Sequence, residues 1–321
     1  MDLHENDKPN PEESEGKKPW AELRPGLLTG DYTHVGFADE TQYNTGRYRA
    51  ISLTTLSVSD LTLVENDLAT TIKRSGVSSE MRWKKVDGAK YGFAADHLFD
   101  YWLTRLQEGM VRVDTLVWDT EDPRHDVIGR DDAANLQDMF RCLVRRVVQD
   151  RWGSSTRWAL FPDHGSTIDW PALQQSINDR GTEWTISHGV IRPIRDTSIE
   201  LVQEVCSREC PLVQVADLFA GVAVFSYQHF DEFMHWRNVY RPYCDITGRM
   251  MHEGDSSLTN SQQARSHVLN QMLQRVKRDF PGISFLRDHG LETRRRSCPL
   301  NFWLYRPQHS SDVAPVRRLA S

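Results

Sequence analysis

The segment PLVQVADLFAGVAVFSY, residues 211–227, is an apolar run that contains a single aspartate. Pro211 suits the first turn of a helix, and Val215 and Phe219 recur at helical spacing, so the run predicts a buried helix. A buried carboxylate that has no cation, hydrogen-bond network or proton costs several kcal/mol. Asp217 therefore indicates either a satisfied polar residue of the core or a metal ligand whose partner ligands lie elsewhere in the chain.

Size and charge narrow the class of protein. The chain has 321 residues, of which 39% are hydrophobic and 26% are charged, as expected for one large α/β domain or two small ones. Its formal net charge of -6 excludes a protein that holds nucleic acid by bulk positive charge, although it is compatible with a local basic groove. A metal site built from carboxylates would also make the net charge negative.

No segment predicts export or membrane insertion. The N-terminal stretch MDLHENDKPNPEESEGKK is polar and charged and lacks the apolar core of a signal peptide. The most apolar segment, residues 211–227, is short and contains Gln214 and Asp217, which argues against a membrane span. The five cysteines form no dense framework. We therefore expect a cytoplasmic protein with no membrane partner.

Strand and helix patterns alternate along the middle of the chain. Residues 33–58 predict a β-hairpin, because Val35, Phe37 and Asp39 fall on one face of the first strand pattern and a second pattern follows. Helix patterns then alternate with the strand patterns VRVDTLVWD and STRWALFPD. This order predicts an α/β fold, a mixed β-sheet flanked by helices. We expect four parts: a disordered N-terminal tail over residues 1–30, the α/β domain over 31–230, a helical C-terminal extension over 231–305 that forms a lid or the surface of a homodimer, and a flexible tail over 306–321.

Several carboxylates fall at the ends of predicted elements. Asp39 ends the first strand pattern, Asp119 ends VRVDTLVWD and Asp163 ends STRWALFPD, while Glu80 lies in the short segment GVSSEMRWKKV. A single aspartate at a strand end is usually a turn initiator. Open α/β sheets, however, bind ligands at the carboxyl ends of their strands, and converging carboxylates suit hard cations such as Mg²⁺ and Mn²⁺. Two such ions can activate a water and stabilise the leaving oxygen of a phosphodiester.

Four motifs, in this order, resemble the landmarks of one family. VGFADET, EMRWKKV, WALFPDHG and LVQVADLFAGV look like the landmarks of the domain of unknown function 3800, which is related to the RNase H and integrase fold. The fourth motif matches closely, because Gln214, Ala216, Asp217, Ala220 and Gly221 follow the family's Gln-x-Ala-Asp-x-x-Ala-Gly pattern. The resemblance extends over about residues 33–227 and does not cover the last third of the chain.

Two positions depart from the family's pattern. Thr41 stands where the family has a serine after Asp39 and Glu40, and Arg82 stands where it has the lysine of a Glu-x-Lys motif that begins here at Glu80. These departures weaken the first two motifs and leave the third and fourth intact.

The resemblance implies both a fold and an activity. It implies an RNase H-like fold and, by analogy, a metal-dependent nuclease that hydrolyses phosphodiester bonds of DNA or RNA. Magnesium or manganese, as two ions, would be held by Asp39, Glu80, Asp163 and Asp217, which would be the catalytic residues. A role in defence against phage or mobile elements is the biological setting that the resemblance suggests.

One ligand and the activity itself stay open. In RNase H-like folds a carboxylate commonly ends the strand after the first long helix, which by element order is Asp119, whereas the motif match selects Asp163. Both are therefore candidate metal ligands. Arg82 and the acidic net charge also support a second hypothesis, a non-catalytic RNase H-like module that binds nucleic acid or a protein partner.

Two local signals compete with a magnesium or manganese site. Cys206 and Cys210, with Cys244 downstream, suggest zinc only weakly because no second cysteine pair follows. His164, next to Asp163, is a candidate general base or phosphate contact, although a loop histidine is the commoner case.

A basic strip is the remaining candidate for nucleic-acid contact. Arginines close to Trp152 and Trp158 could hold a single strand through its phosphates and stack its bases, but Trp158 also fits a core strand. The arginines of this strip are Arg141, Arg145, Arg146, Arg151 and Arg157.

Overall fold

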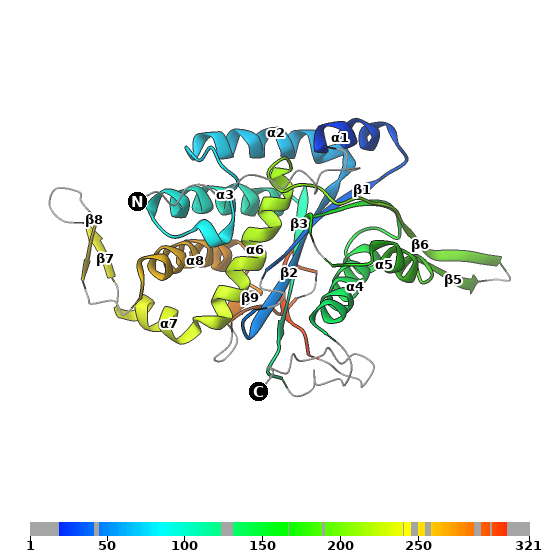
Figure 1. Ribbon diagram of the computed structural model, residues 1–321. Coiled ribbons are helices and arrows are strands. Elements are labelled where there is room, and N and C mark those ends of the chain that lie inside the picture. Colours follow the sequence, from blue (N-terminus) through cyan, green and yellow to red (C-terminus); the bar gives the residue numbers. More distant parts are fainter. Residues whose placement is uncertain are drawn as a thin grey trace.

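The computed structural model describes residues 19–41, 45–122, 131–165, 167–187, 190–239, 241–244, 250–253, 258–285, 290–295 and 297–306. Its helices are α1 (Trp20–Thr29), α2 (Val58–Arg74), the 3₁₀ helix η2 (Trp83–Lys85), α3 (Ala89–Gln107), α4 (Asp132–Asp150), α5 (Trp170–Asn178), α6 (Pro211–Gln228), α7 (Phe230–Val239) and α8 (Asn260–Asp279). Its strands are β1 (His34–Thr41), β2 (Tyr48–Ser57), β3 (Val111–Asp119), β4 (Ser155–Pro162), β5 (Thr182–Ser187), β6 (Val190–Val202), β7 (Arg241–Cys244), β8 (Met250–Glu253), β9 (Ile283–Phe285), β10 (Leu291–Thr293) and β11 (Leu300–Leu304). Figure 1 shows their arrangement.

A mixed seven-stranded sheet forms the centre of the molecule, with the strand order β11-β3-β2-β1-β4-β6-β5. β1, β2 and β3 form an antiparallel meander, while β4 lies parallel to β1 and β6 lies parallel to β4. The predicted fold class is confirmed: the protein has an α/β fold with a mixed sheet flanked by helices, consistent with the RNase H-like fold.

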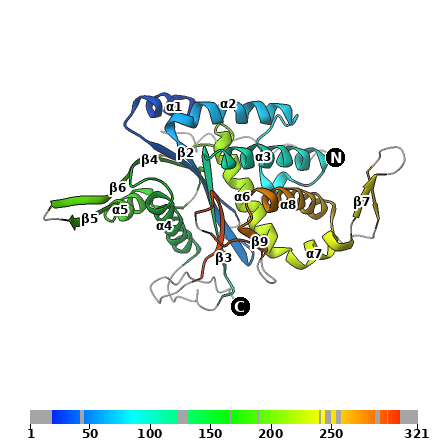
Figure 2. The same ribbon diagram turned by 180° about the vertical axis from the view of Figure 1, so that it is seen from behind.

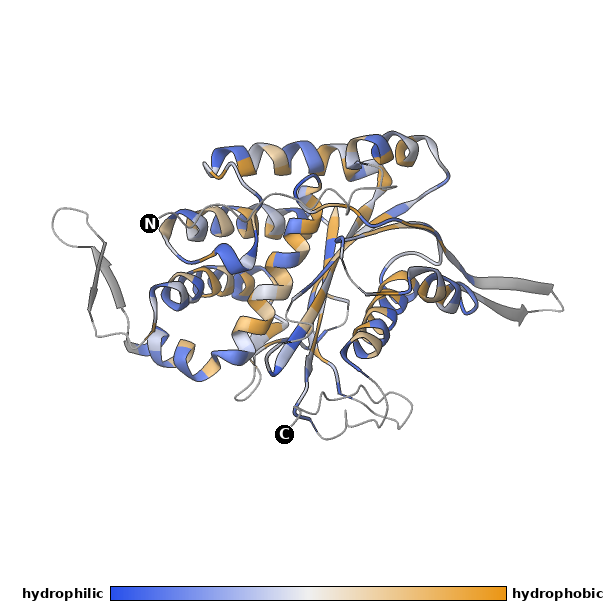
Figure 3. Cartoon of the chain, in the orientation of Figure 1, coloured by the Kyte–Doolittle hydropathy of each residue, from blue (hydrophilic) through white to orange (hydrophobic). Residues whose placement is uncertain are grey.

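Helices cover both faces of this sheet (Figure 2). The helices α1, α2, α3, α6 and α8 pack on one face, and α4 and α5 pack on the other. The alternation of β1 follows this division, since Val35 and Phe37 join the core under α6 while Ala38 joins the core under α4. Figure 3 shows how strongly apolar residues are concentrated in α6 and the strands below it. Among the described helices, none is both long enough and apolar enough to cross a bilayer.

The two ends of the chain differ from the expected parts. Helix α1 lies within the segment predicted to be a disordered tail, and Trp20 anchors it by packing edge-on against Phe37 and Phe161. The C-terminal part is not purely helical, because β9, β10 and β11 follow α8. Residues 1–18 and 307–321, in the two predicted tails, lie outside the described residues.

Strand β11 completes the sheet next to β3, with the two strands parallel. Its Asn301 Nδ2 donates to Oδ1 of Asp114 on β3 at 3.1 Å, and Arg151 Nε donates to the same oxygen at 3.2 Å. Asp114 is fully buried, and burial raises the pKa of its carboxyl although Arg151, Arg112 and Asn301 oppose that rise. This polar group therefore depends on a strand from the far end of the chain.

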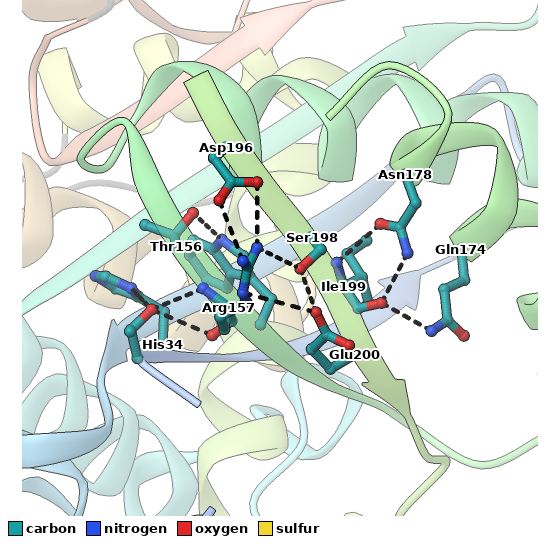
Figure 4. Close-up of polar contacts among 11 residues, drawn as sticks. His34, Thr156, Arg157, Gln174, Asn178, Asp196, Ser198, Ile199 and Glu200 are labelled. Atoms are coloured by element: carbon teal, nitrogen blue, oxygen red, sulfur yellow. Dashed lines mark hydrogen bonds and ion pairs between the residues drawn. The ribbon is translucent and has the colours of Figure 1, made fainter. Parts of the chain in front are cut away.

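Side chains replace a missing strand along one side of β6 (Figure 4). The pairing of β4 with β6 shifts by one residue after Ile199, and β5 pairs with β6 no further than Asp196. Asn178 of α5 then satisfies Ile199, accepting from its N–H at 2.8 Å and donating to its carbonyl at 2.9 Å. Arg157 of β4 reaches across to Asp196 and Ser198. These contacts support β6 beside β4, the strand that Asp163 follows.

A close contact fixes η2 on helix α6. The indole of Trp83 lies directly over Gly221, where a Cβ would stand only 2.2 Å from Cγ of Trp83. Only glycine leaves room for a ring at this distance, so the small residue of the fourth motif makes space for the protein's own tryptophan.

Replacing Gly221 with alanine tests this contact. We expect Gly221→Ala to lower the free energy of unfolding by about 2 kcal/mol, because overpacking of a filled core typically costs about 1–3 kcal/mol. Denaturant unfolding measures the change. Gly92→Ala in α3 is the matched control: its Cβ would meet only Val268 Cγ2 at 3.9 Å, so higher helix propensity should raise stability by up to about 1 kcal/mol. Equal denaturant midpoints for Gly221→Ala and Gly92→Ala would contradict the conclusion that Gly221 makes room for the Trp83 ring.

Candidate functional site

Parallel pairing of β1 and β4 brings two of the predicted ligands together. Ala38 is paired with Pro162, and the Asp163 N–H donates to the Ala38 carbonyl at 2.8 Å. Asp39 and Asp163 are thus the next residues on neighbouring strands, at the carboxyl ends where α/β folds bind ligands. Asp39 continues the alternation of Val35 and Phe37 and so lies on the face covered by α6.

Helix α6 holds the segment around Glu80 through two side chains one turn apart. Gln214 Oε1 accepts the Met81 N–H at 2.9 Å, and Asp217 Oδ2 accepts the Trp83 N–H at 2.5 Å. The amide of Gln214 also donates to the Ser207 carbonyl at 2.6 Å. We call this set of three hydrogen bonds the Gln214–Asp217 clamp. It satisfies backbone groups of two loops that have no regular partner.

Ser207 connects two carboxylates and an arginine. Its N–H donates to Asp163 Oδ1 at 3.1 Å, and its hydroxyl donates to Glu80 Oε1. Arg82 forms an ion pair with the same Glu80 oxygen at 2.7 Å and donates to the Ser207 hydroxyl at 3.2 Å. The Glu80 carboxylate, only 6% exposed, is therefore already occupied by partners of this chain.

A polar pocket of about 520 Å³ opens over these residues, a size typical of ligand sites. Four carboxylates line it, from Asp39, Glu40, Asp163 and Asp217. Its other charged lining residues are Arg82, Lys84 and Arg265, and Phe225 and His229 stand at the far end of α6. Glu80 is close by but does not line the pocket.

The pocket carboxylates are held in an unfavourable electrostatic state. Burial, and then repulsion by Asp217 and Asp163, raises the pKa of Asp39 well above its usual range. Burial also raises the pKa of Asp217 to about 6 and that of Glu40 to about 7, with the charge of Asp163 adding to both. The positive charge of Arg82 opposes the rise in the pKa values of Asp217 and Asp163. One guanidinium shared with Glu80 does not compensate for the excess of buried negative charge.

These residues fit a hard divalent cation by their chemistry. All the donors are carboxylate oxygens, which Mg²⁺ and Mn²⁺ prefer, and a cation would remove the repulsion that raises their pKa values. Within the described part of the chain, no three His, Cys, Asp or Glu side chains form a ready metal site.

Asp119 is placed apart from the other predicted ligands. Asp39 is paired with Ser52 and Ser52 with Thr115, so Asp119 lies two strands away and four residues, about 13 Å, further along β3. Its carboxylate oxygens accept from Arg47 at 2.9 and 2.8 Å. Of the two alternatives for the third ligand, the structure brings Asp163, and not Asp119, to Asp39 and Asp217.

The competing signals have structural roles where they are described. Trp158 is fully buried, Arg151 binds the buried Asp114, and Arg157 pairs with Asp196, so the basic strip is largely used within the protein. Among the cysteines of the weak zinc pattern, Cys206 and Cys210 are free thiols, and the side chain of Cys244 lies outside the described residues. His164 does not line the pocket.

Three residues of the site were not sequence candidates. Glu40 belongs to the first motif, but only its neighbour Asp39 was expected to bind metal. Ser207 lies in the turn before Pro211, and no pattern of the sequence indicates its contacts. Arg265 lies in the C-terminal third, for which no motif suggested a role.

Comparison with known proteins shows which family the chain belongs to. No protein-family model matches the chain. The chain is 33% identical over 289 residues to the uncharacterized protein ORF2′ of Methanothermobacter thermautotrophicus. The aligned region covers 88% of this chain and 97% of the relative. The chain is also 32% identical over 289 residues, with the same coverage, to the uncharacterized protein ORF2 of the same organism. The chain belongs to the family of these two proteins.

Proposed function

We propose that the protein is a magnesium- or manganese-dependent nuclease that hydrolyses phosphodiester bonds of DNA or RNA. The observation that supports this most directly is the excess of buried, mutually repelling carboxylates in one pocket at the carboxyl ends of β1 and β4. Such charge is costly without a function that uses it. The resemblance to the domain of unknown function 3800 supports the same activity, and the suggested role in defence stays a prediction.

Asp39, Asp163 and Asp217 are the residues we propose to hold the metal. Bound ions would supply an activated water and stabilise the leaving oxygen of the phosphodiester. The chain's own contribution is orientation: the Trp83 N–H fixes Asp217, and the Ser207 N–H fixes Asp163. Glu80 would join as a ligand only after Arg82 releases it.

A second candidate function is a non-catalytic module that binds nucleic acid or a protein partner. The ion pair between Arg82 and Glu80 favours it, because that pair already neutralises one predicted ligand without a metal. The two functions differ in whether a divalent cation binds the folded protein.

Removing single ligands tests the nuclease proposal. We expect Asp39→Asn and Asp217→Asn to reduce Mn²⁺-dependent cleavage of DNA or RNA by roughly 100-fold or more, because an amide is a poor ligand for a hard cation. Cleavage of labelled oligonucleotides measures the loss. Asp119→Asn is the matched control and should keep parental activity, because Asp119 is bound to Arg47 away from the pocket.

Two outcomes would separate the candidates. If Mn²⁺ raises the melting temperature of the parent but not of Asp39→Asn, a cation binds the pocket. If neither cleavage nor a Mn²⁺-dependent shift is found in the parent, the nuclease proposal is wrong and the binding module is favoured.

The raised carboxyl pKa values predict how the metal-free protein responds to pH. In the unfolded chain Asp217 titrates near its ordinary value of 3.8, whereas folding raises its pKa to about 6. Between about pH 4 and pH 6 the folded state therefore binds more protons than the unfolded state, and its stability falls as pH rises through this range. Glu40, raised to about 7, extends the fall toward neutral pH.

Asparagine at position 217 cannot ionise but can still accept the Trp83 N–H. With a chelator present, we expect Asp217→Asn to match the parent near pH 4 and to exceed it at pH 8, by on the order of 1 kcal/mol. Thermal unfolding across this pH range measures the difference. Asp119→Asn serves as the control, since losing the Arg47 pair should give no gain. A variant that is less stable than the parent at pH 8 would refute the proposed charge repulsion.

A further inference from the structure

We propose that Arg265 binds a backbone phosphate of the substrate, next to the phosphate that is cleaved at the carboxylates. This inference rests on the proposed function, and it deepens it by assigning a task to the C-terminal part of the chain. Arg265 lines the same pocket as Asp39 and Asp217, although it comes from helix α8.

The guanidinium of Arg265 has hydrogen-bonding capacity that the described protein does not use. Its Nη2 donates to the Lys84 carbonyl at 3.0 Å, while its buried Nε has no hydrogen-bond partner among the described residues. Burial lowers the pKa of Arg265 and Asp87 opposes that shift, yet these two residues form no ion pair in the described structure. A half-buried guanidinium stays charged, and its Nη1, for which the described residues supply no hydrogen bond, is the donor that an anion in the pocket would bind.

The position of Arg265 suits the anionic backbone of a polymer. Helix α6 runs along the pocket from Asp217 to Gln228, a distance of about 16 Å at 1.5 Å per residue. The carboxylates gather at the Asp217 end, whereas His229 follows the other end of α6. Arg265 lies one turn beyond Gln262, whose amide is 3.5 Å from Nδ1 of His229, and so supplies positive charge toward that end, where it can hold a phosphate that the carboxylates would repel.

The placement of Arg265 is set by a well-formed helix start. Thr259 caps α8 and forms a reciprocal capping box with Gln262, one turn before Arg265. The Gln262 amide also lies 3.5 Å from Nδ1 of His229. These contacts tie the beginning of α8 to the end of α6 and hold Arg265 at the pocket.

A binding experiment without divalent cations tests this role separately from cleavage. Fluorescence anisotropy with labelled single- and double-stranded DNA and RNA oligonucleotides, in chelator and across a salt series, gives the affinity and its salt dependence. We expect Arg265→Gln to raise Kd about tenfold at low salt and to reduce the slope of log K against log salt by about 0.7 for single strands, one phosphate contact. The matched control is Arg278→Gln on the same helix, whose side chain is 70% exposed and paired with Asp279, and which should bind like the parent.

Two further variants distinguish this inference from a structural role and from the nuclease proposal. Arg265→Lys keeps the charge and should restore most of the salt slope, and Asp39→Asn should keep the Arg265-dependent binding although it loses cleavage. Arg265→Gln binding with parental affinity and slope would overturn the phosphate contact and leave the nuclease proposal standing. Loss of binding in both Arg265 variants together with a lowered melting temperature would also overturn it, since Arg265 would then be structural. A parent that binds none of the oligonucleotides in chelator would overturn the phosphate contact, whereas the nuclease proposal is decided by Mn²⁺-dependent cleavage and the Mn²⁺-dependent shift.

Discussion

The Gln214–Asp217 clamp is the interaction on which the arrangement of the pocket depends. Two side chains, one turn apart on a helix that is otherwise almost wholly apolar, take up the Met81 N–H, the Trp83 N–H and the Ser207 carbonyl. These backbone groups belong to loops without strand or helix partners, and leaving them unsatisfied inside the protein would be costly. Because the clamp sets both loops, it also sets the positions of the Glu80 carboxylate and the Ser207 hydroxyl.

Asp217 has two roles in this arrangement, one as a hydrogen-bond acceptor and one as a buried negative charge. As an acceptor for the Trp83 N–H it is a satisfied core residue, one of the two interpretations open to it in the sequence. As a carboxylate in the same buried pocket it adds to the rise in the pKa of Asp39, and the charge of Asp163 in turn helps to raise the pKa of Asp217. A cation would offset the negative charge without disturbing the hydrogen bond, because a carboxylate has two oxygens and the Trp83 N–H uses only one.

Much of the fold could be predicted, since strand alternation and the apolar run of α6 are local patterns. The nearness of Asp39 and Asp163 also follows from two strand patterns that end in aspartate, once β1 and β4 are adjacent and parallel. Asp119 could not be separated from Asp163 in this way, because its distance from the pocket depends on the register of β3 across β2. The roles of Ser207 and Arg265 could not be predicted for a similar reason. Their contacts join segments that are distant in sequence, and no local sequence pattern indicates such contacts. Helix α1 was missed because the segment is polar overall and its buried residues, Trp20 and Leu27, are too few to give a helical pattern.

Strand β11 has a consequence for how the chain acquires its structure during synthesis. The outer edge of β3 finds its partner only in residues 300–304, so a ribosome must translate most of the message before that edge is covered. Until then the nascent polypeptide displays an open strand edge with Asp114 beside it, lacking the amide of Asn301. Vectorial folding of the seven-stranded sheet is therefore incomplete until β11 emerges from the exit tunnel, and the interval before that is when a chaperone would be most needed.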